Sequence, residues 1–438
     1  MTGKHMFERI FHFEKYKTNL KIEIVAGFTT FMSMAYILLV NPLLLSESGM
    51  PLQAAFTATV WASVLPTLIM GFFANLPIAL APGMGVNAFF TYTLVHGMGL
   101  NWENALAAVF ISGLLFTLAA LLNIPKYIMQ AVPKELKIAI GVGIGFFITL
   151  IGFQNAGITV KNDATMLMLG DLSQLPALLA VLGLIFTVTL LHRGVKGALL
   201  WGILAITAAA VLLGVSPAPK GIPDIISTDI PSISPVFLHL QFGQVLKISF
   251  LAVFFSMTMV DLFNAMGTFI GLSSKLGEDE NGIIRGLKPA TLADASGTLM
   301  GSLLGTSPVT SYLESITGIT EGGRTGLTAI TCAALFLVSL VFAPLVQLIP
   351  SFATAPCLIL VGAFMMQDIG EIDFSNIGES LPAFLVIVSM PFTYNIVSGF
   401  GLGFISYCII QTCIGRGREL SPLLWIISLC FLINFIVS

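Results

Sequence analysis

Hydrophobic residues occur along this chain in long blocks, and the polar residues are confined to short breaks between the blocks. A helix needs ~20 mostly apolar residues to cross the hydrocarbon core of a bilayer, so each block is expected to form one membrane-spanning helix. The expected spans are 22–45, 54–74, 78–95, 102–124, 135–158, 175–192, 197–215, 244–273, 287–304, 307–321, 326–349, 353–370, 380–394 and 396–415. The pattern therefore predicts an all-α polytopic membrane protein with fourteen transmembrane segments.

A polar, proline-rich stretch divides these spans into two sets of seven. Because seven is an odd number, the second set enters the bilayer from the opposite side, which makes the two sets an inverted repeat, as in many secondary transporters. We expect a cytoplasmic N-terminal segment, a first repeat, an extracytoplasmic linker, a second repeat and a C-terminal segment, at 1–21, 22–215, 216–243, 244–415 and 416–438. A further apolar run at 421–437 either spans the membrane or lies at its surface, and the sequence leaves both open.

The third block of each repeat is interrupted by residues that break helices. Pro82 lies in the first interruption, at 80–87, and Pro308 lies in the second, at 305–311. Too few helix-compatible residues follow each break to cross a bilayer at 1.5 Å per residue. Two continuous, proline-kinked helices are the alternative, since Pro and Gly are common in membrane helices. The matching positions favour two discontinuous helices, spans 3 and 10, which meet near the midplane beside a cavity.

Composition agrees with a membrane protein, because 56% of the residues are hydrophobic and only 9% are charged, against roughly 25% charged in soluble domains. The net charge of −3 argues against a nucleic-acid partner, which requires a basic surface. The cysteines all lie in apolar runs, which is typical of small buried side chains. The histidines lie in loops and ends without the spacing of metal ligands, so we expect neither a metal nor a cofactor.

Lysine and arginine are distributed unevenly between the two sides of the predicted topology. With a cytoplasmic N-terminus, 16 of the 19 basic residues fall inside, and only Lys161, Lys220 and Lys247 fall outside. This distribution follows the positive-inside rule, and an error in the span count would scramble it. We therefore expect a multi-pass protein of a bacterial-type inner (cell) membrane, in contact with membrane lipid and with its N-terminus in the cytoplasm.

Three acidic residues, Asp261, Asp294 and Glu314, lie inside apolar blocks with no basic residue close in sequence. A carboxylate in the bilayer centre costs at least ~2.5–3.5 kcal/mol, so such a group finds a partner or takes up a proton. We expect Glu314 and Asp261 to couple transport to a proton; a hydrogen-bonded structural role is the alternative for each. For Asp294 the structural role is favoured, as an acid that caps the broken helix beside it.

Two asparagines are further candidates for the substrate site. Asn264 follows Asp261 by three residues and so shares its helix face. Asn87 lies in the first interruption, where its amide could offer a ligand both a donor and an acceptor. A satisfied polar contact between helices is the alternative for Asn264, and packing is the alternative for Asn87. Thr310 and Ser311 are polar residues expected near the site. A third pattern, the glycines at 141, 143 and 145, is typical of a helix-packing face.

Two long motifs resemble those of a known transporter family. Residues 81–92, Ala-Pro-Gly-Met-Gly-Val-Asn-Ala-Phe-Phe-Thr-Tyr, resemble the third-span motif of the AzgA-like purine permeases in the nucleobase–ascorbate transporter superfamily. The runs 305–315 and 321–328 resemble their tenth-span signature, and 27–36 and the segment around Asp261 are similar as well. The resemblance covers essentially the whole chain.

The resemblance implies a core domain, at about 22–124 and 244–349, and a gate domain, at about 125–215 and 350–415. It also implies proton-coupled import of adenine, guanine or hypoxanthine. By motif position the residues that hold the base or couple its movement are Asn87, Asp261, Tyr312 and Glu314. One departure is visible, because Asn264 and Ala265 stand where the family usually has Asp and Thr. This departure leaves the substrate preference open.

Two other classes of function remain as alternatives. An anion exchanger or channel of the related sulfate/bicarbonate-type fold would share the inverted repeat, but an anion favours a basic or neutral pocket rather than Glu314 and Asp261. An intramembrane enzyme would need a nucleophile–base pair or metal ligands within the spans, and the sequence offers neither. The expected partners are therefore a purine nucleobase and a proton, with no catalytic residue, and whether the protein works as a homodimer is left open.

Overall fold

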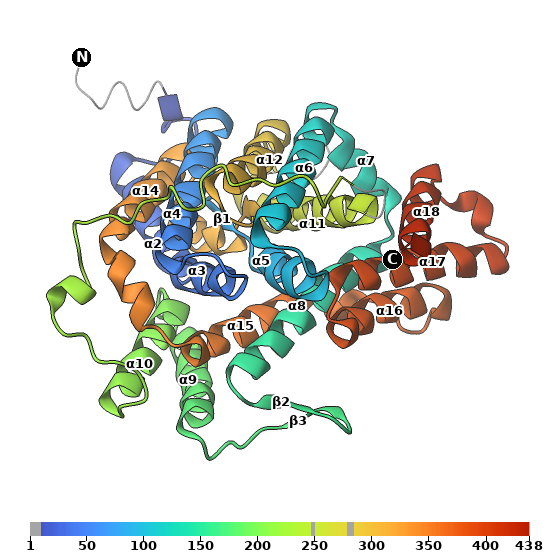
Figure 1. Cartoon of the computed structure of the whole chain (residues 1–438). Helices are drawn as coiled ribbons and strands as arrows, with labels where there is room; N and C mark the ends of the chain where they lie inside the picture. The colour runs from blue at the N-terminus through green and yellow to red at the C-terminus, as the bar shows by residue number, and fades with distance from the viewer. Residues whose placement is uncertain (1–9, 247–249, 278–283, 438) are drawn as a thin grey trace.

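The computed structural model describes residues 10–246, 250–277 and 284–437, so part of the predicted N-terminal segment 1–21 and the predicted outer Lys247 lie outside the described residues. Helices dominate the described part of the chain (Figure 1). In the first half these are α2 (Leu20–Met34), α3 (Ile37–Glu47), α4 (Leu52–Ile69), η1 (Met70–Ala74), α6 (Trp102–Leu121), α7 (Ile124–Ala131), α8 (Lys134–Asn155), α9 (Leu175–His192) and α10 (Ala198–Leu212).

The second half repeats this helical pattern after the linker, whose described residues contain the short helix η3 (Ile222–Asp224). The helices are α11 (Leu251–Leu276), α12 (Leu287–Leu304), α14 (Gly326–Val338), η6 (Ser339–Leu348), α15 (Ser351–Met365), η7 (Gln367–Glu371), α16 (Ile377–Thr393), α17 (Ile396–Cys413), η8 (Gly417–Glu419) and α18 (Pro422–Val437). Nine helical stretches of the described chain are long and apolar enough to cross a membrane, some of them made of two labelled helices, such as α2 with α3 (Leu20–Glu47). Helices α10, α16 and α18 are shorter and apolar. The count of fourteen spans stays a prediction.

Polar side chains set several helix starts inside the apolar sequence. The Asn101 side chain accepts a hydrogen bond from the Asn104 N–H at the start of α6, and Asn395 does the same for Val397 and Ser398 at the start of α17. Such caps satisfy N–H groups that have no partner within the helix. The breaks between apolar blocks therefore contain the residues that start the next helix.

The helices of the two halves pack together in two groups. In one group α2, α4 and α6 contact α12 and α14, and in the other α8 and α9 contact α15, while α8 also contacts α16. Each group therefore combines helices of both repeats, which is the arrangement that the core and gate prediction requires. The division into these two domains stays a prediction.

A β-hairpin for which the sequence analysis made no prediction follows α8. Strands β2 (Thr159–Asn162) and β3 (Met166–Leu169) pair antiparallel, with Thr159 opposite Leu169. The Asn162 side chain accepts hydrogen bonds from the Ala164 and Thr165 N–H groups and so closes the turn. The hairpin extends away from the helices (Figure 1).

Candidate functional site

The two interrupted segments meet as a pair of short buried strands. Strand β1 (Leu80–Pro82) pairs antiparallel with β4 (Val309–Ser311), with Ala81 opposite Thr310. The ladder continues beyond the strands, because the Gly83 N–H donates to the Pro308 carbonyl at 3.0 Å and the Tyr312 N–H donates to the Ala79 carbonyl at 3.1 Å. Backbone that leaves helical geometry inside an apolar core thus finds its partners in the other repeat.

Side chains from neighbouring helices satisfy the outer edges of this strand pair. On the β1 side, the Leu80 N–H donates to Thr67 Oγ1 of α4 at 2.8 Å. On the β4 side, the Ser311 N–H donates to Asp294 Oδ2 of α12 at 2.7 Å, and Thr268 of α11 donates to the Ser311 carbonyl at 3.1 Å. Open strand edges are unstable in an apolar interior, so these polar residues are needed for the strands to exist.

A short helical segment follows each strand. After β1 come α5 (Met84–Ala88) and η2 (Phe89–Gly97), and after β4 come η5 (Leu313–Ser315) and α13 (Ile316–Thr320). Because the strands are antiparallel, these segments leave the pair in opposite directions. The polar residues predicted from the sequence therefore lie where two helical segments begin against one strand pair.

Asn87 of α5 is fully buried and joins this helix to the loop before β4. Its Oδ1 accepts a hydrogen bond from Ser307 at 2.5 Å. The neighbouring Asn41 amide donates to Thr59 at 2.8 Å and to Thr306 at 3.0 Å. Asn41 was missed by the sequence analysis, although an Asn-Pro pair inside an apolar block is a signal for a polar contact.

Tyr312 and Glu314 follow β4 directly, and each makes a long-range contact. The Tyr312 hydroxyl donates to the Pro82 carbonyl at 2.5 Å, and the Asn87 amide nitrogen lies 3.5 Å from the same oxygen. The Tyr36 hydroxyl, at the junction of α2 and α3, donates to Glu314 Oε1 at 2.8 Å. Tyr36 is a second residue that the sequence analysis did not name as a candidate, and its signal was its place at the end of the 27–36 motif.

The two acids on α11 and α12 lie behind β4. Asp261 is fully buried, and its Oδ2 accepts from the Thr298 hydroxyl at 3.0 Å. Asp294 is also fully buried and accepts from both the N–H and the hydroxyl of Ser311. The buried Thr310 hydroxyl, by contrast, has no hydrogen-bond partner among the described residues. The structure thus brings both acids next to β4, the strand that contains the predicted polar residues Thr310 and Ser311.

Asn264 stands apart from these contacts. It is half-buried on α11, one turn after Asp261, and the described residues provide no hydrogen bond for its amide. The adjacent Ala265 is fully buried. The position that departs from the family motif therefore has an amide group that no described residue engages.

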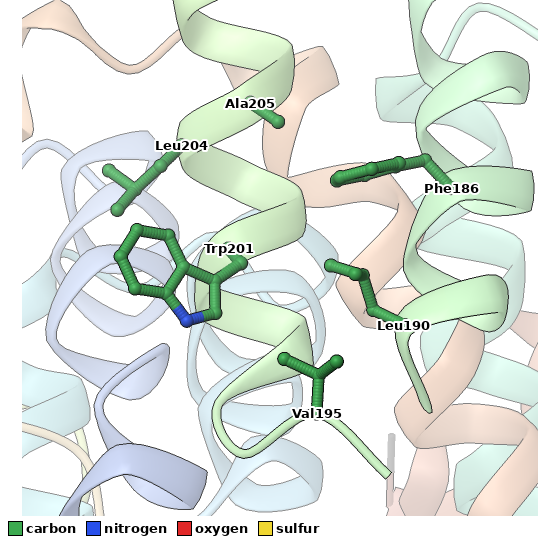
Figure 2. A pocket seen from close by; sticks show the side chains of 6 residues that line it. All are labelled: Phe186, Leu190, Val195, Trp201, Leu204 and Ala205. Atoms are coloured by element: carbon green, nitrogen blue, oxygen red, sulfur yellow. The ribbon is translucent and has the colours of Figure 1, made fainter. Parts of the chain in front are cut away.

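The described surface also contains grooves away from the strand pair. One lies between α9 and α10 and has a volume of about 490 Å³. Figure 2 shows the apolar side chains that line it, among them Phe186, Leu190 and Trp201. A second groove of about 410 Å³ lies near Arg418 and Trp425. Neither groove contains a residue predicted for the substrate site, so the strand pair, with its buried polar groups, is the better candidate.

Comparison with known proteins assigns the family. A family model described as Permease family matches residues 21–402. The chain is 45% identical to a putative permease of Methanocaldococcus jannaschii, over 98% of each chain. It is 37% identical to the adenine permease AdeP of Escherichia coli, over 99% of this chain and 97% of the relative. It is 39% identical to the guanine/hypoxanthine permease PbuO of Bacillus subtilis, over 98% of this chain and 100% of the relative.

Solved structures show the fold. The transmembrane domain of a cyanobacterial bicarbonate transporter, BicA, matches with a TM-score of 0.64 at 19% identity, over 86% of this chain and 97% of that chain. The murine anion transporter Slc26a9, in its inward-facing state, matches with a TM-score of 0.64 at 10% identity, over 90% of this chain and 68% of that chain. The predicted class, a helical polytopic membrane protein, is confirmed, with two short strand pairs as additions, and so is the predicted resemblance to purine permeases. The chain therefore belongs to the permease family and is an integral membrane transporter, not an enzyme.

Proposed function

We propose that this permease imports purine nucleobases, namely adenine, guanine or hypoxanthine, by proton symport. The relatives named as adenine and guanine/hypoxanthine permeases support the substrate class, because they align with nearly the whole chain. The observation that carries the proposal is the pairing of β1 with β4. Carboxyl, amide and hydroxyl groups lie beside this pair, and they support a polar substrate site there.

The chemistry of these groups suits a purine. A purine edge presents alternating donors and acceptors, and a carboxylate or an amide can meet two of them at once. In the proposed site Glu314 and Asn264 contact the base, Tyr312 lines the site, and Asn87 contacts the base from the first repeat. Asp261 lies behind β4, where Thr298 connects it to the Val309 carbonyl at 3.1 Å. Asp294, Thr310 and Ser311 support the strand.

Proton coupling follows from the buried acids. A carboxyl group in an apolar interior with no basic partner is costly when ionised, so binding and release of a proton are natural steps for it. We propose that Asp261 and Glu314 perform these steps, loading a proton outside and releasing it inside. The protein then functions in the inner cell membrane with its N-terminus in the cytoplasm, and it needs no cofactor.

Anion transport is the second candidate, because the two solved structures that share the fold are described as bicarbonate and anion transporters. An anion would be repelled by ionised Asp261 or Glu314 and attracted by a basic side chain. Among the described residues, no lysine or arginine donates a hydrogen bond to the groups at β1 and β4. The site therefore supports a neutral base better than an anion.

Uptake in cells that lack their own purine permeases tests this function. Labelled adenine, guanine and hypoxanthine are compared with sulfate, bicarbonate and uracil, with and without a protonophore. We expect purine accumulation that collapses with the protonophore, together with alkalinisation of the outside medium when a purine is added. Accumulation of bicarbonate or sulfate in place of purines would overturn the substrate class. Accumulation that survives the protonophore and follows a sodium gradient would overturn proton coupling alone.

A further inference from the structure

Two fully buried carboxyl groups lie close together behind β4. Asp261 of α11 is held by Thr298 of α12, whose hydroxyl donates to Asp261 Oδ2 at 3.0 Å. Thr298 follows Asp294 by four residues on the same helix, so the two side chains share one helix face. Thr298 therefore places the Asp261 carboxyl beside that of Asp294.

No positive charge compensates this pair in the described part of the chain. The ion pairs formed there involve neither acid. The elements packed on α11 and α12 carry further charged residues in their terminal turns: Glu103 of α6, Lys126 of α7, Lys134, Glu135 and Lys137 of α8, Lys275 of α11 and Lys288 of α12. Tyr312 and Glu314 are titratable groups on the segment after β4. Tyr407 and Cys408 are titratable groups of α17, which packs against α11.

The pair also has unused hydrogen-bonding capacity. Asp261 Oδ1, Asp294 Oδ1 and Thr310 Oγ1 are buried, and none of them has a hydrogen-bond partner among the described residues. Two neighbouring carboxylates in a low-dielectric interior repel each other and cannot both remain ionised without a counter-charge. One bound proton removes the repulsion and leaves a single negative charge on the pair.

The two acids differ in the number of hydrogen bonds that they accept. Asp294 Oδ2 accepts two hydrogen bonds, from the N–H and the hydroxyl of Ser311, whereas Asp261 accepts one, from Thr298. Donors stabilise the charged form of a carboxyl group. Asp294 is therefore the better suited of the two to be the carboxylate, and Asp261 is the better suited to hold the proton.

The pair is connected to the strand that carries the substrate site. Asp294 binds Ser311, which Tyr312 and Glu314 follow in the chain, and Thr298 donates both to Asp261 and to the Val309 carbonyl of the same strand. A hydroxyl has one proton to donate, so Thr298 exchanges between these two acceptors. A change of charge on Asp261 therefore changes a hydrogen bond at β4.

We propose that Asp261 and Asp294 act as one proton-carrying acid pair, in which Asp294 holds β4 as a carboxylate while Asp261 binds and releases the transported proton. This inference rests on the proposed proton symport and adds to it a role for Asp294 beyond that of a helix cap. A proton from the outer side binds Asp261, moves with the substrate and leaves to the inner side, and no covalent bond is made or broken.

The pH profile of transport tests the pair. Purified protein in liposomes is assayed for uptake of the best of the three purines across a range of pH. Asp294→Asn removes the neighbouring negative charge, so Asp261 loses its proton more readily, and the alkaline limb of the profile shifts to lower pH by about one unit. Thr298→Val removes the donor to Asp261, so the same limb shifts to higher pH. Ser302→Ala is the matched control, since Ser302 is a buried residue of α12 whose hydroxyl donates within its own helix, and its profile stays that of the wild type.

Opposite shifts from two substitutions on one helix separate a proton-carrying pair from structural damage, which would lower uptake without moving the profile. If Asp294→Asn does not insert, Thr298→Val decides alone: a shift to higher pH supports the pair, and an unmoved profile overturns it. Wild-type protein with protonophore-sensitive uptake but variants with unmoved profiles would overturn the pair and leave the proposed function standing. Wild-type protein that takes up no purine would instead overturn the proposed function.

Discussion

At the scale of single residues, several polar side chains inside the spans form hydrogen bonds with backbone groups, and they are therefore not available to a ligand. The side chains of Thr67, Thr268 and Asp294 form hydrogen bonds with the backbone groups at the outer edges of the β1–β4 pair. An unsatisfied backbone group in a buried position costs about 1–3 kcal/mol, so these residues are required for the strands to form. Residues whose hydrogen-bonding groups are not all used in this way, such as Glu314 and Asn264, are the better candidates for substrate contact.

Glu314→Ala is expected to abolish purine uptake while leaving expression and membrane insertion intact. The reason is that the carboxyl group lies directly after β4 and interacts with Tyr36 across the two repeats. Tyr36→Phe, which removes only the hydroxyl, is expected to reduce uptake partially. The control is Thr320→Val on the following helix, whose hydroxyl donates to its own helix. Near-normal uptake by Glu314→Ala would exclude this residue from the site.

Asn87→Ala tests whether its amide contacts the base. If it does, we expect substrate binding to weaken by about 1–3 kcal/mol, the range for leaving a buried partner unsatisfied, in a binding assay on purified protein. Asn87 also accepts from Ser307, so Ser307→Ala serves as the comparison that disturbs the loop but leaves the amide in place. Equal losses of folded protein in both variants, with unchanged affinity, would make Asn87 a packing residue.

At the scale of elements, glycine spacing decides how closely α8 packs. A Cβ on Gly145 would lie 2.7 Å from the Gly362 carbonyl of α15, and one on Gly143 would lie 2.8 Å from the Met390 sulfur of α16. Gly141 has nothing within 4 Å of such an atom. The close contact of α8 with both helices therefore depends on two of the three glycines that the sequence pattern singled out.

Gly145→Ala is accordingly expected to lower the free energy of unfolding by about 1–3 kcal/mol, the usual cost of overpacking. The melting temperature of the purified protein should fall as a result. Gly141→Ala on the same helix is the control, and it is expected to be neutral or slightly stabilising, because alanine favours a helix over glycine by about 1 kcal/mol. Equal melting temperatures for the two variants would show that α8 can move away from α15 at no cost.

At the scale of the whole molecule, the ion pair between Lys196 and Glu321 joins the two predicted domains. Lys196, between α9 and α10 in the predicted gate, forms a 2.8 Å ion pair with Glu321 and donates to Thr29 at 3.3 Å, both in the predicted core. Gly197 lies against the same region of α2, since a Cβ there would be 2.9 Å from the Met32 carbonyl. This contact therefore favours the conformation that the structure shows.

Lys196→Gln and Glu321→Gln are each expected to lower the maximal rate of purine uptake, by up to about fivefold, without changing the affinity. The pair is partly exposed, with 49% and 38% of the two side chains accessible, so it contributes only about 0–1 kcal/mol and its loss leaves the fold intact. Uptake kinetics measure the effect. Recovery of the rate in the reversed pair Lys196→Glu/Glu321→Lys would support the link, and no recovery would contradict it.

The predicted orientation can be measured by labelling with a membrane-impermeant maleimide. In a Cys413→Ser background, which removes the exposed native thiol, Ala164→Cys lies in the turn of the β2–β3 hairpin and Arg418→Cys lies before α18. We expect Ala164→Cys to react in intact cells and Arg418→Cys to react only after the cells are permeabilised. The reverse pattern would place the N-terminus outside.

The sequence by itself determined the helices and the places where they break. A membrane-spanning helix satisfies its own backbone and depends on a local run of apolar residues, so helices such as α9 and α12 occupy the predicted residues 175–192 and 287–304. The breaks at 80–87 and 305–311 were visible because proline and glycine act locally. The β2–β3 hairpin was not, since its strands are short and carry no periodic signal.

Only the tertiary structure decided which polar residues meet. The pairing of β1 with β4, the hydrogen bond from Tyr36 to Glu314 and the placement of Asp261 beside Asp294 through Thr298 each join segments far apart in the chain. A local pattern shows that a buried polar group needs a partner, but it does not choose among the partners that the chain offers. That choice depends on which helices pack together, and therefore the spans follow from hydropathy while the site follows from the fold.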